Sequence, residues 1–153
     1  MRPTEPSPAM LPHAAPASHY RRLLLFAIRR MATGGISDAH AAHAIFTGFG
    51  LSYRRPLVLL RALMAELSRV AATRLTVAHC CCPRMTNDEM ILLDSIADAP
   101  LQPGSAHAKL RSLLRVHSCP GALISAQAVA AAFADLGMPL HDDCVSRNSD
   151  ELF

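Results

Sequence analysis

Apolar residues recur along this chain at intervals of three and four, which is the spacing of one face of an α-helix. In the first such segment Leu24, Ile28 and Met31 share a face, Ser18 is a suitable N-cap, and the pair at 34–35 is Gly-Gly. Together with their capping and breaking residues, the patterns predict six helices. Their expected spans are 18–34, 38–47, 56–73, one opening at 86 and closing before 100, 104–116, and 125–137.

Local signals support two of these helix starts. Thr86 and Glu89 have the spacing of a capping box, in which each side chain accepts a hydrogen bond from the other residue's backbone. Pro56 suits the first turn of the third helix, since proline has no amide hydrogen to leave unpaired there.

The first helix is apolar nearly all round. Leu25 and Phe26 fall among its arginines, on the side away from the main apolar face. Two interpretations stay open: the helix is buried on two sides, or it offers Leu25 and Phe26 to a protein partner or to a second copy of the chain.

These patterns predict an all-α protein, a compact bundle of about six helices. Hydrophobic residues make up 51% of the 153, whereas aromatic residues make up only 5% and tryptophan is absent, so the core must be aliphatic. Five of the 11 prolines lie in residues 1–17, which predicts a flexible arm, disordered or extended. We expect a single helical domain over 18–140 and a polar tail over 141–153.

Charge is unevenly distributed along the chain. Residues 1–84 carry 11 basic and 3 acidic side chains, and residues 85–153 carry 4 basic and 9 acidic ones. The asymmetry favours either an acidic partner or pairing between the two halves of the chain.

Two predicted loops carry the candidate chemistry. One contains His79-Cys80-Cys81-Cys82-Pro83, and the other contains His117-Ser118-Cys119-Pro120. In an extended run Cys80 and Cys82 point the same way and Cys81 points oppositely. If the loops meet, they offer zinc a tetrahedral site. The candidate ligands are Cys80, Cys82, Cys119, His79 and His117.

Other interpretations of the cysteines remain open. Free cysteine often packs inertly in a core. A thiol-dependent enzyme or redox sensor would need an activated, accessible thiol. The zinc hypothesis makes one sharp prediction: the sulfur of Cys80 or Cys82 should lie within about 4 Å of that of Cys119.

The expected compartment follows from the absence of a signal segment, a membrane-spanning run and a disulfide framework. The first residues have no apolar signal segment, and the apolar run Leu23–Ile28 is too short to span a bilayer. Five cysteines, three of them adjacent, do not form a secreted disulfide framework, so we expect reduced thiols in the cytoplasm. The basic N-terminal half and the helix order over 38–72 keep a DNA-associated regulator as an alternative function.

The chain also shows a resemblance to known proteins in three stretches, DAHAAHAIFTGFGLSYRRPLVLLRALMAELSRVA, HCCCPRMTNDE and AQAVAAAFADLGMPL. These resemble a family of small helical bacterial proteins classed as a domain of unknown function, over about residues 20–140. The family has no assigned activity, so the resemblance implies no catalytic residues. We therefore expect a small cytoplasmic binding or regulatory protein with a zinc or thiol site.

Overall fold

Six α-helices make up most of the described chain, and the all-α prediction is confirmed. The computed structural model describes residues 10–141. The helices are α1 (His19–Gly34), α2 (Ala39–Phe49), α3 (Arg54–Val70), α4 (Asn87–Asp98), α5 (Pro103–Leu114) and α6 (Pro120–Asp135). A single turn of 3-10 helix, η2 (Gly50–Ser52), joins α2 to α3.

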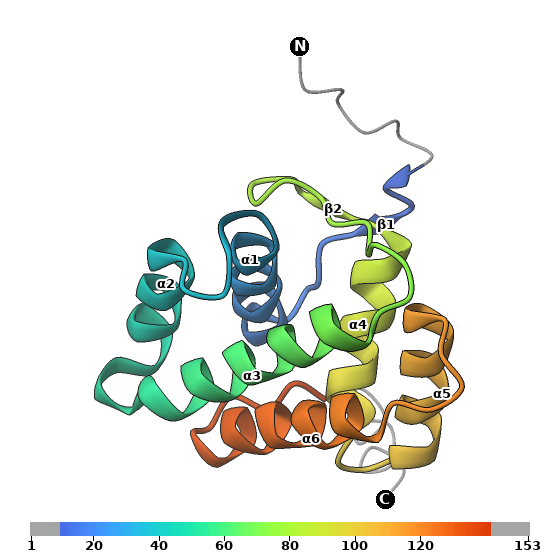
Figure 1. The fold of residues 1–153 in the computed structure, drawn as a ribbon. Coiled ribbons are helices and arrows are strands. Elements are labelled where there is room, and N and C mark those ends of the chain that lie inside the picture. The colour runs from blue at the N-terminus through green and yellow to red at the C-terminus, as the bar shows by residue number, and fades with distance from the viewer. Residues whose placement is uncertain (1–9, 142–153) are drawn as a thin grey trace, which may run out of the picture.

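The helices associate in three neighbouring pairs. Figure 1 shows α1 beside α2, α3 alongside α6, and α4 beside α5. Helix α4 also packs against both α1 and α6, so it connects the pairs. Side-chain caps set the starts of three helices, because Ser18, Asp38 and Thr86 each accept a hydrogen bond from a backbone amide three residues later.

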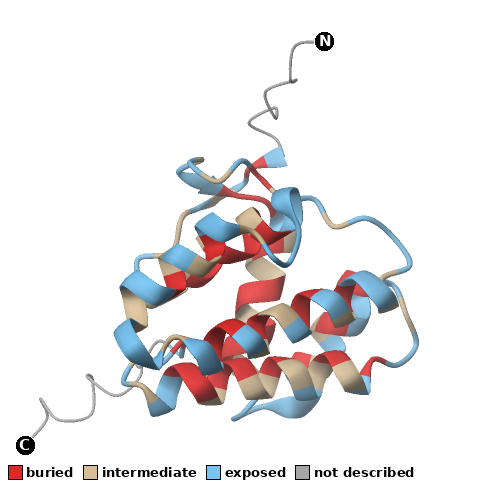
Figure 2. Ribbon diagram, turned by 60° about the vertical axis from the view of Figure 1, so that its left-hand side comes forward, coloured by how far each residue is buried: buried red, intermediate tan, exposed pale blue. Residues whose placement is uncertain are grey.

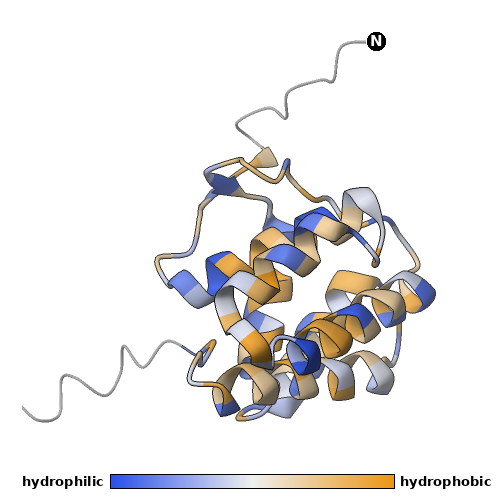
Figure 3. Cartoon of the chain, turned by 90° about the vertical axis from the view of Figure 1, so that its left-hand side faces the viewer, coloured by the Kyte–Doolittle hydropathy of each residue, from blue (hydrophilic) through white to orange (hydrophobic). Residues whose placement is uncertain are grey.

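The core lies where the three pairs meet. Figure 2 shows buried residues on the inward faces of the helices and exposed residues outside, and Figure 3 shows hydrophobic and hydrophilic residues sharing the same helices. The largest fully buried side chains are mostly aliphatic, with one aromatic among them: Phe133, Leu24, Ile28, Ile45, Leu60, Leu63, Leu93, Ile96, Leu110, Leu114, Val129 and Pro56. This agrees with the aliphatic core that the composition predicts.

Helix α1 is buried on two sides. Leu25 is only 4% exposed and belongs to the core, whereas Phe26 is half-buried. The reason is that α2 packs on α1 from one direction while α3 and α4 pack from others. The interpretation that offered Leu25 to a partner is therefore corrected: its surface is already covered within the chain.

Helix α6 begins five residues earlier than the predicted start at Ser125. Pro120 occupies its first turn, where proline is favoured, and Cys119 is its N-cap. Gly121 lies against Glu66 on α3, and a Cβ there would require only the flexible end of that side chain to move. The pair Pro120-Gly121, which resembles a turn, is thus the start of a helix packed closely on its neighbour.

The described part of the N-terminal arm is extended and tied to the body. Strand β1 (His13–Ala14) pairs antiparallel with β2 (Arg84–Met85), and the Ala15 amide donates to the Pro83 carbonyl at 3.0 Å. Arg84 donates to the backbone carbonyls of Leu11 and Pro12. The predicted flexible arm is therefore held in place over residues 10–17, while residues 1–9 and the predicted tail from 142 lie outside the described residues.

Salt bridges connect the basic half of the chain to the acidic half. Three of them cross the boundary between residues 84 and 85: Arg21 with Asp94, Arg29 with Glu89, and Arg55 with Asp135. This supports pairing between the halves as one role of the charge asymmetry. Within residues 10–141, none of the helices is both long enough and apolar enough to cross a bilayer.

Candidate functional site

The cysteine run forms a tight turn and is not extended. The amide of Cys82 donates a hydrogen bond to the carbonyl oxygen of His79 at 3.0 Å, which closes a four-residue turn. Cys80 and Cys81 occupy its two central positions. A turn rotates successive side chains differently from a strand, so the alternation expected of an extended run does not apply.

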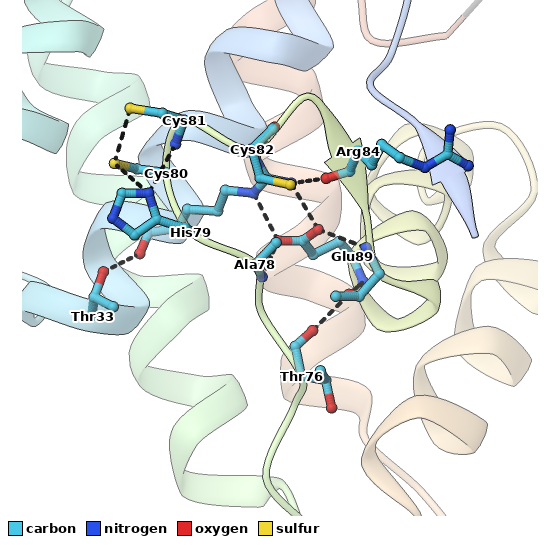
Figure 4. A network of polar contacts seen from close by, with 11 residues as sticks. Thr33, Thr76, Ala78, His79, Cys80, Cys81, Cys82, Arg84 and Glu89 are labelled. Carbon is cyan, nitrogen blue, oxygen red and sulfur yellow. Dashed lines mark hydrogen bonds and ion pairs between the residues drawn. The ribbon is translucent and has the colours of Figure 1, made fainter. Parts of the chain in front are cut away.

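The turn gathers one imidazole and two thiols. The sulfur atoms of Cys80 and Cys81 lie 3.5 Å apart, and the Cys80 sulfur lies 3.8 Å from Nδ1 of His79. All three donor atoms lie within 4.8 Å of one another, and no other such group occurs among residues 10–141. Figure 4 shows both sulfurs and the His79 ring on one side of the turn, with Glu89 on the other. His79 and Cys81 are exposed and Cys80 is half-buried.

A buried ion pair fixes the backbone of this turn. Nε of Arg29 on α1 donates to Oε1 of Glu89 on α4 at 2.8 Å, and the two side chains are 3% and 1% exposed. The same guanidinium donates through Nη1 to the carbonyl of Cys82 at 2.9 Å and through Nη2 to that of Arg84 at 2.7 Å. One arginine thus ties the end of the turn to two helices.

Glu89 is saturated with hydrogen bonds, which is what allows a charge to be buried. Besides Arg29, its carboxylate accepts from the backbone amides of Ala78 and Thr86, each at 2.9 Å. The Thr86 hydroxyl donates to the Thr76 carbonyl at 2.6 Å and accepts from the Glu89 amide. The capping box predicted from the sequence is confirmed, and it also anchors both segments that flank the turn.

A second guanidinium lies close to the thiols. Arg30 donates two hydrogen bonds to the Asp38 carboxylate, at 3.2 and 3.0 Å. The hydrogen bond to Asp38 raises the pKa of Arg30; partial desolvation opposes this, and the neighbouring Cys80 adds a smaller increase. Arg30 therefore stays charged beside the Cys80 sulfur, with its position set by Asp38.

Asp38 makes the stability of the α1–α2 corner depend on pH. The hydrogen bond from Arg30 and the one from the Ala41 amide hold the pKa of Asp38 below its usual value. A carboxylate whose pKa is lower when folded contributes stability that is present at neutral pH and is lost as the pH falls below about 4. Asp38→Asn should therefore narrow the gap between urea midpoints measured at neutral and acidic pH. An unchanged gap would show that Asp38 does not carry this dependence.

The Cys81 thiol is made less acidic by its neighbour. The hydrogen bond with Cys80 and the charge of an ionised Cys80 raise the pKa of Cys81, and the guanidinium groups of Arg30 and Arg29 oppose this more weakly. Cys81 therefore keeps its proton to a higher pH than an isolated cysteine does.

The structure groups the predicted ligands differently from the sequence-based expectation. His79 and Cys80 lie together, as predicted, but Cys81 joins them while Cys82, Cys119 and His117 stand outside the group. The tight turn explains the exchange of Cys81 for Cys82. The connection between α5 and α6, which carries His117 and Cys119, lies away from the turn (Figure 1). The two loops do not meet, so this two-loop grouping is corrected.

Cys119 matches the inert-core interpretation. It is 2% exposed, and its amide donates to Nε2 of His107 at 3.2 Å. Desolvation by burial raises the pKa of its thiol, and Arg111 opposes this only in part. A buried thiol that resists ionisation is a poor metal ligand and a poor nucleophile.

A groove of about 670 Å³ lies beside the site but does not include it. Its walls come from α1, α3, α4 and the linker after α3, and they are mostly aliphatic, with Arg74 as the charged residue of the lining. None of His79, Cys80 and Cys81 lines it. The thiol–imidazole group therefore faces the surface and not an enclosed substrate cavity.

Sequence reasoning missed the residues that support the turn. The apolar pattern places the arginines of this helix on the side away from its main apolar face, yet Arg29 lies four residues after Leu25 and so shares the second buried face of α1. That spacing was the available signal. Glu89 was recognised only as a helix cap, because its partner is 60 positions away in the sequence.

The fold and the site define a small helical protein with a thiol–imidazole cluster on a surface turn that a buried ion pair holds in place. The chain belongs to a family described as a family of unknown function (DUF6628), whose sequence profile matches residues 6–137. This confirms the resemblance found in the sequence. No curated protein and no solved structure matches the chain.

Proposed function

We propose that this protein binds a thiophilic metal ion, with zinc as the first choice, through His79, Cys80 and Cys81, and acts as a small binding or regulatory protein. The observation that carries the proposal is the clustering of these three donors on one turn. Thiolate and imidazole are the donors that zinc prefers in proteins.

The distances in the turn fit zinc after small adjustments. Tetrahedral bonds of about 2.3 Å to sulfur and about 2.0–2.1 Å to nitrogen place two sulfurs about 3.8 Å apart, and a sulfur and a nitrogen about 3.6 Å apart. The separations in the turn are 3.5 Å between the sulfurs and 3.8 Å between the Cys80 sulfur and His79 Nδ1. The pinned backbone preserves this spacing.

The number of ligands indicates a role in binding or sensing. A purely structural zinc site uses four protein ligands, whereas this turn supplies three and leaves one position for water or for a donor from a ligand or partner. The surface position of the site is consistent with such a donor. The proposal requires a reducing compartment, such as the cytoplasm, to keep the thiols free.

The test is zinc binding by the reduced, untagged protein in competition with a chromophoric chelator. We expect one zinc per chain, and Cys80→Ser, Cys81→Ser or His79→Ala should each weaken binding by about 100-fold or more, because losing even an outer-shell partner typically costs about 10- to 100-fold. Cys82→Ser is the matched control, since Cys82 lies in the same turn but outside the group.

Two results would contradict the proposal. One is the absence of stoichiometric metal combined with a stability that chelator does not change. The other is an equal loss of affinity in Cys82→Ser and Cys80→Ser, which would mean that the three donors identified by the geometry are not the ligands.

A further inference from the structure

Cys80 and Cys81 form a pair of adjacent thiols whose sulfurs already face each other. They lie 3.5 Å apart at the centre of the turn. Cys81 is exposed and Cys80 is half-buried, so small oxidants in solution have access to the pair. The other described cysteines are placed differently: Cys82 stands outside the group, and Cys119 is buried in the core.

We propose that Cys80 and Cys81 form a reversible vicinal disulfide on reaction with a hydroperoxide, and that this oxidation empties the metal site, a second step that rests on the proposed function. The metal cluster and the redox switch would then be two states of one turn.

The chemistry balances with a hydroperoxide as the only co-reactant. The sulfur of one thiol attacks the terminal peroxide oxygen, which forms a sulfenic acid and releases an alcohol, or water if the oxidant is hydrogen peroxide. The second sulfur then attacks the sulfenic sulfur, forming the S–S bond and releasing water. The dithiol loses two electrons and two hydrogens, and the O–O bond is reduced.

Geometry makes this disulfide easy to reverse. Consecutive Cα atoms are about 3.8 Å apart, which is shorter than the roughly 4.4 Å at the lower end of the range for ordinary disulfides. A bridge between neighbours is therefore strained, and strained or exposed disulfides have the higher reduction potentials of labile, regulatory bonds. Cellular thiols can return such a bond to the dithiol.

Surrounding residues favour closure within the turn. Arg29 holds the carbonyls of Cys82 and Arg84, so the turn cannot easily unfold to bring in a distant thiol. The charged guanidinium of Arg30 lies beside Cys80 and attracts electron density developing on that sulfur. Once the two sulfurs are bonded, two of the three metal donors are lost together.

The first experiment uses metal-free protein carrying Cys82→Ser, treated with hydrogen peroxide and then with an alkylating reagent. Trypsin cleavage after Arg74 and Arg84 releases peptide 75–84, in which Cys80 and Cys81 are then the only cysteines. We expect this peptide to lose two hydrogens, to escape alkylation, and to recover both thiols after reduction. In a variant that also carries Cys81→Ser, the peptide should no longer lose two hydrogens.

Other products would overturn the inference. These are disulfides between chains, a crosslink from Cys80 to Cys119 or Cys144, or two alkylated thiols that persist after the peroxide has been consumed. Because this arm contains no metal, its result does not depend on whether the protein binds zinc.

The second experiment adds peroxide to zinc-loaded protein and follows metal release with a chromophoric chelator. One zinc should be released per vicinal disulfide formed, and reduction should restore binding. Disulfide formation with zinc retained would overturn the coupling of the two states. Failure to load zinc at all would contradict the proposed function while leaving the metal-free result to decide on the disulfide.

Discussion

Glu89→Gln is expected to lower the free energy of unfolding by about 3–5 kcal/mol, because it leaves the buried Arg29 guanidinium without its counter-charge. The two side chains are 3% and 1% exposed, so water cannot replace the lost carboxylate. Glutamine has nearly the same shape, but its one oxygen cannot accept all the hydrogen bonds that the carboxylate receives from Arg29, Ala78 and Thr86. Urea unfolding followed by circular dichroism measures the change.

Glu66→Gln is the matched control for that prediction. Glu66 also forms an ion pair with an arginine, Arg69, but in this pair the arginine is 71% exposed and lies only three residues away. Water and salt screen such a pair, so its loss should have a much smaller effect. Similar losses in the two variants would mean that the Arg29–Glu89 pair has no special role in stability.

Glu89→Gln should also weaken zinc binding without changing any ligand. The carboxylate orients Arg29, and Arg29 in turn holds the carbonyls of Cys82 and Arg84 at the end of the turn. A turn that is less firmly held spends less time with its three donors in place, which lowers the apparent affinity. The measurement is the chelator competition, at a temperature where the variant remains folded.

Whether a structural feature can be predicted from the sequence depends on how far apart in the chain the interacting residues lie. Ser18 and the pair Thr86 and Glu89 act within one helical turn, so their patterns predict the helix starts correctly. The start of α6 at Pro120 lies five residues before the predicted one, because Pro-Gly is also typical of turns and the packing of α6 on α3 joins segments that are distant in the sequence.

The candidate site was predictable only in its chemistry. The run 79–82 contains an imidazole and three thiols, which are typical zinc ligands. Which of these donor atoms lie close together depends on the hydrogen bond that closes the turn. That turn is flanked by contacts from α1 and α4 that no local pattern encodes. Cys119 looked equivalent to the other cysteines because periodicity does not report burial at the start of a helix.

Phe133→Ala should match Glu89→Gln in stability loss and yet leave the site intact. Phe133 is fully buried and meets Phe49 edge to face, with ring centroids 4.9 Å apart. Removing such a ring leaves a cavity and typically costs about 3–5 kcal/mol. For a chain of this length, that loss lowers Tm by about 6–20 °C.

Comparison of these two variants separates general stability from positioning of the turn. None of the hydrogen bonds that tie the turn to α1 and α4 involves α6, so Phe133→Ala should keep its zinc affinity within about twofold at a temperature where it is folded. Glu89→Gln, at equal stability loss, should bind zinc distinctly more weakly. If affinity instead falls equally in both, the turn depends only on the folded core, and the buried ion pair does not position the ligands.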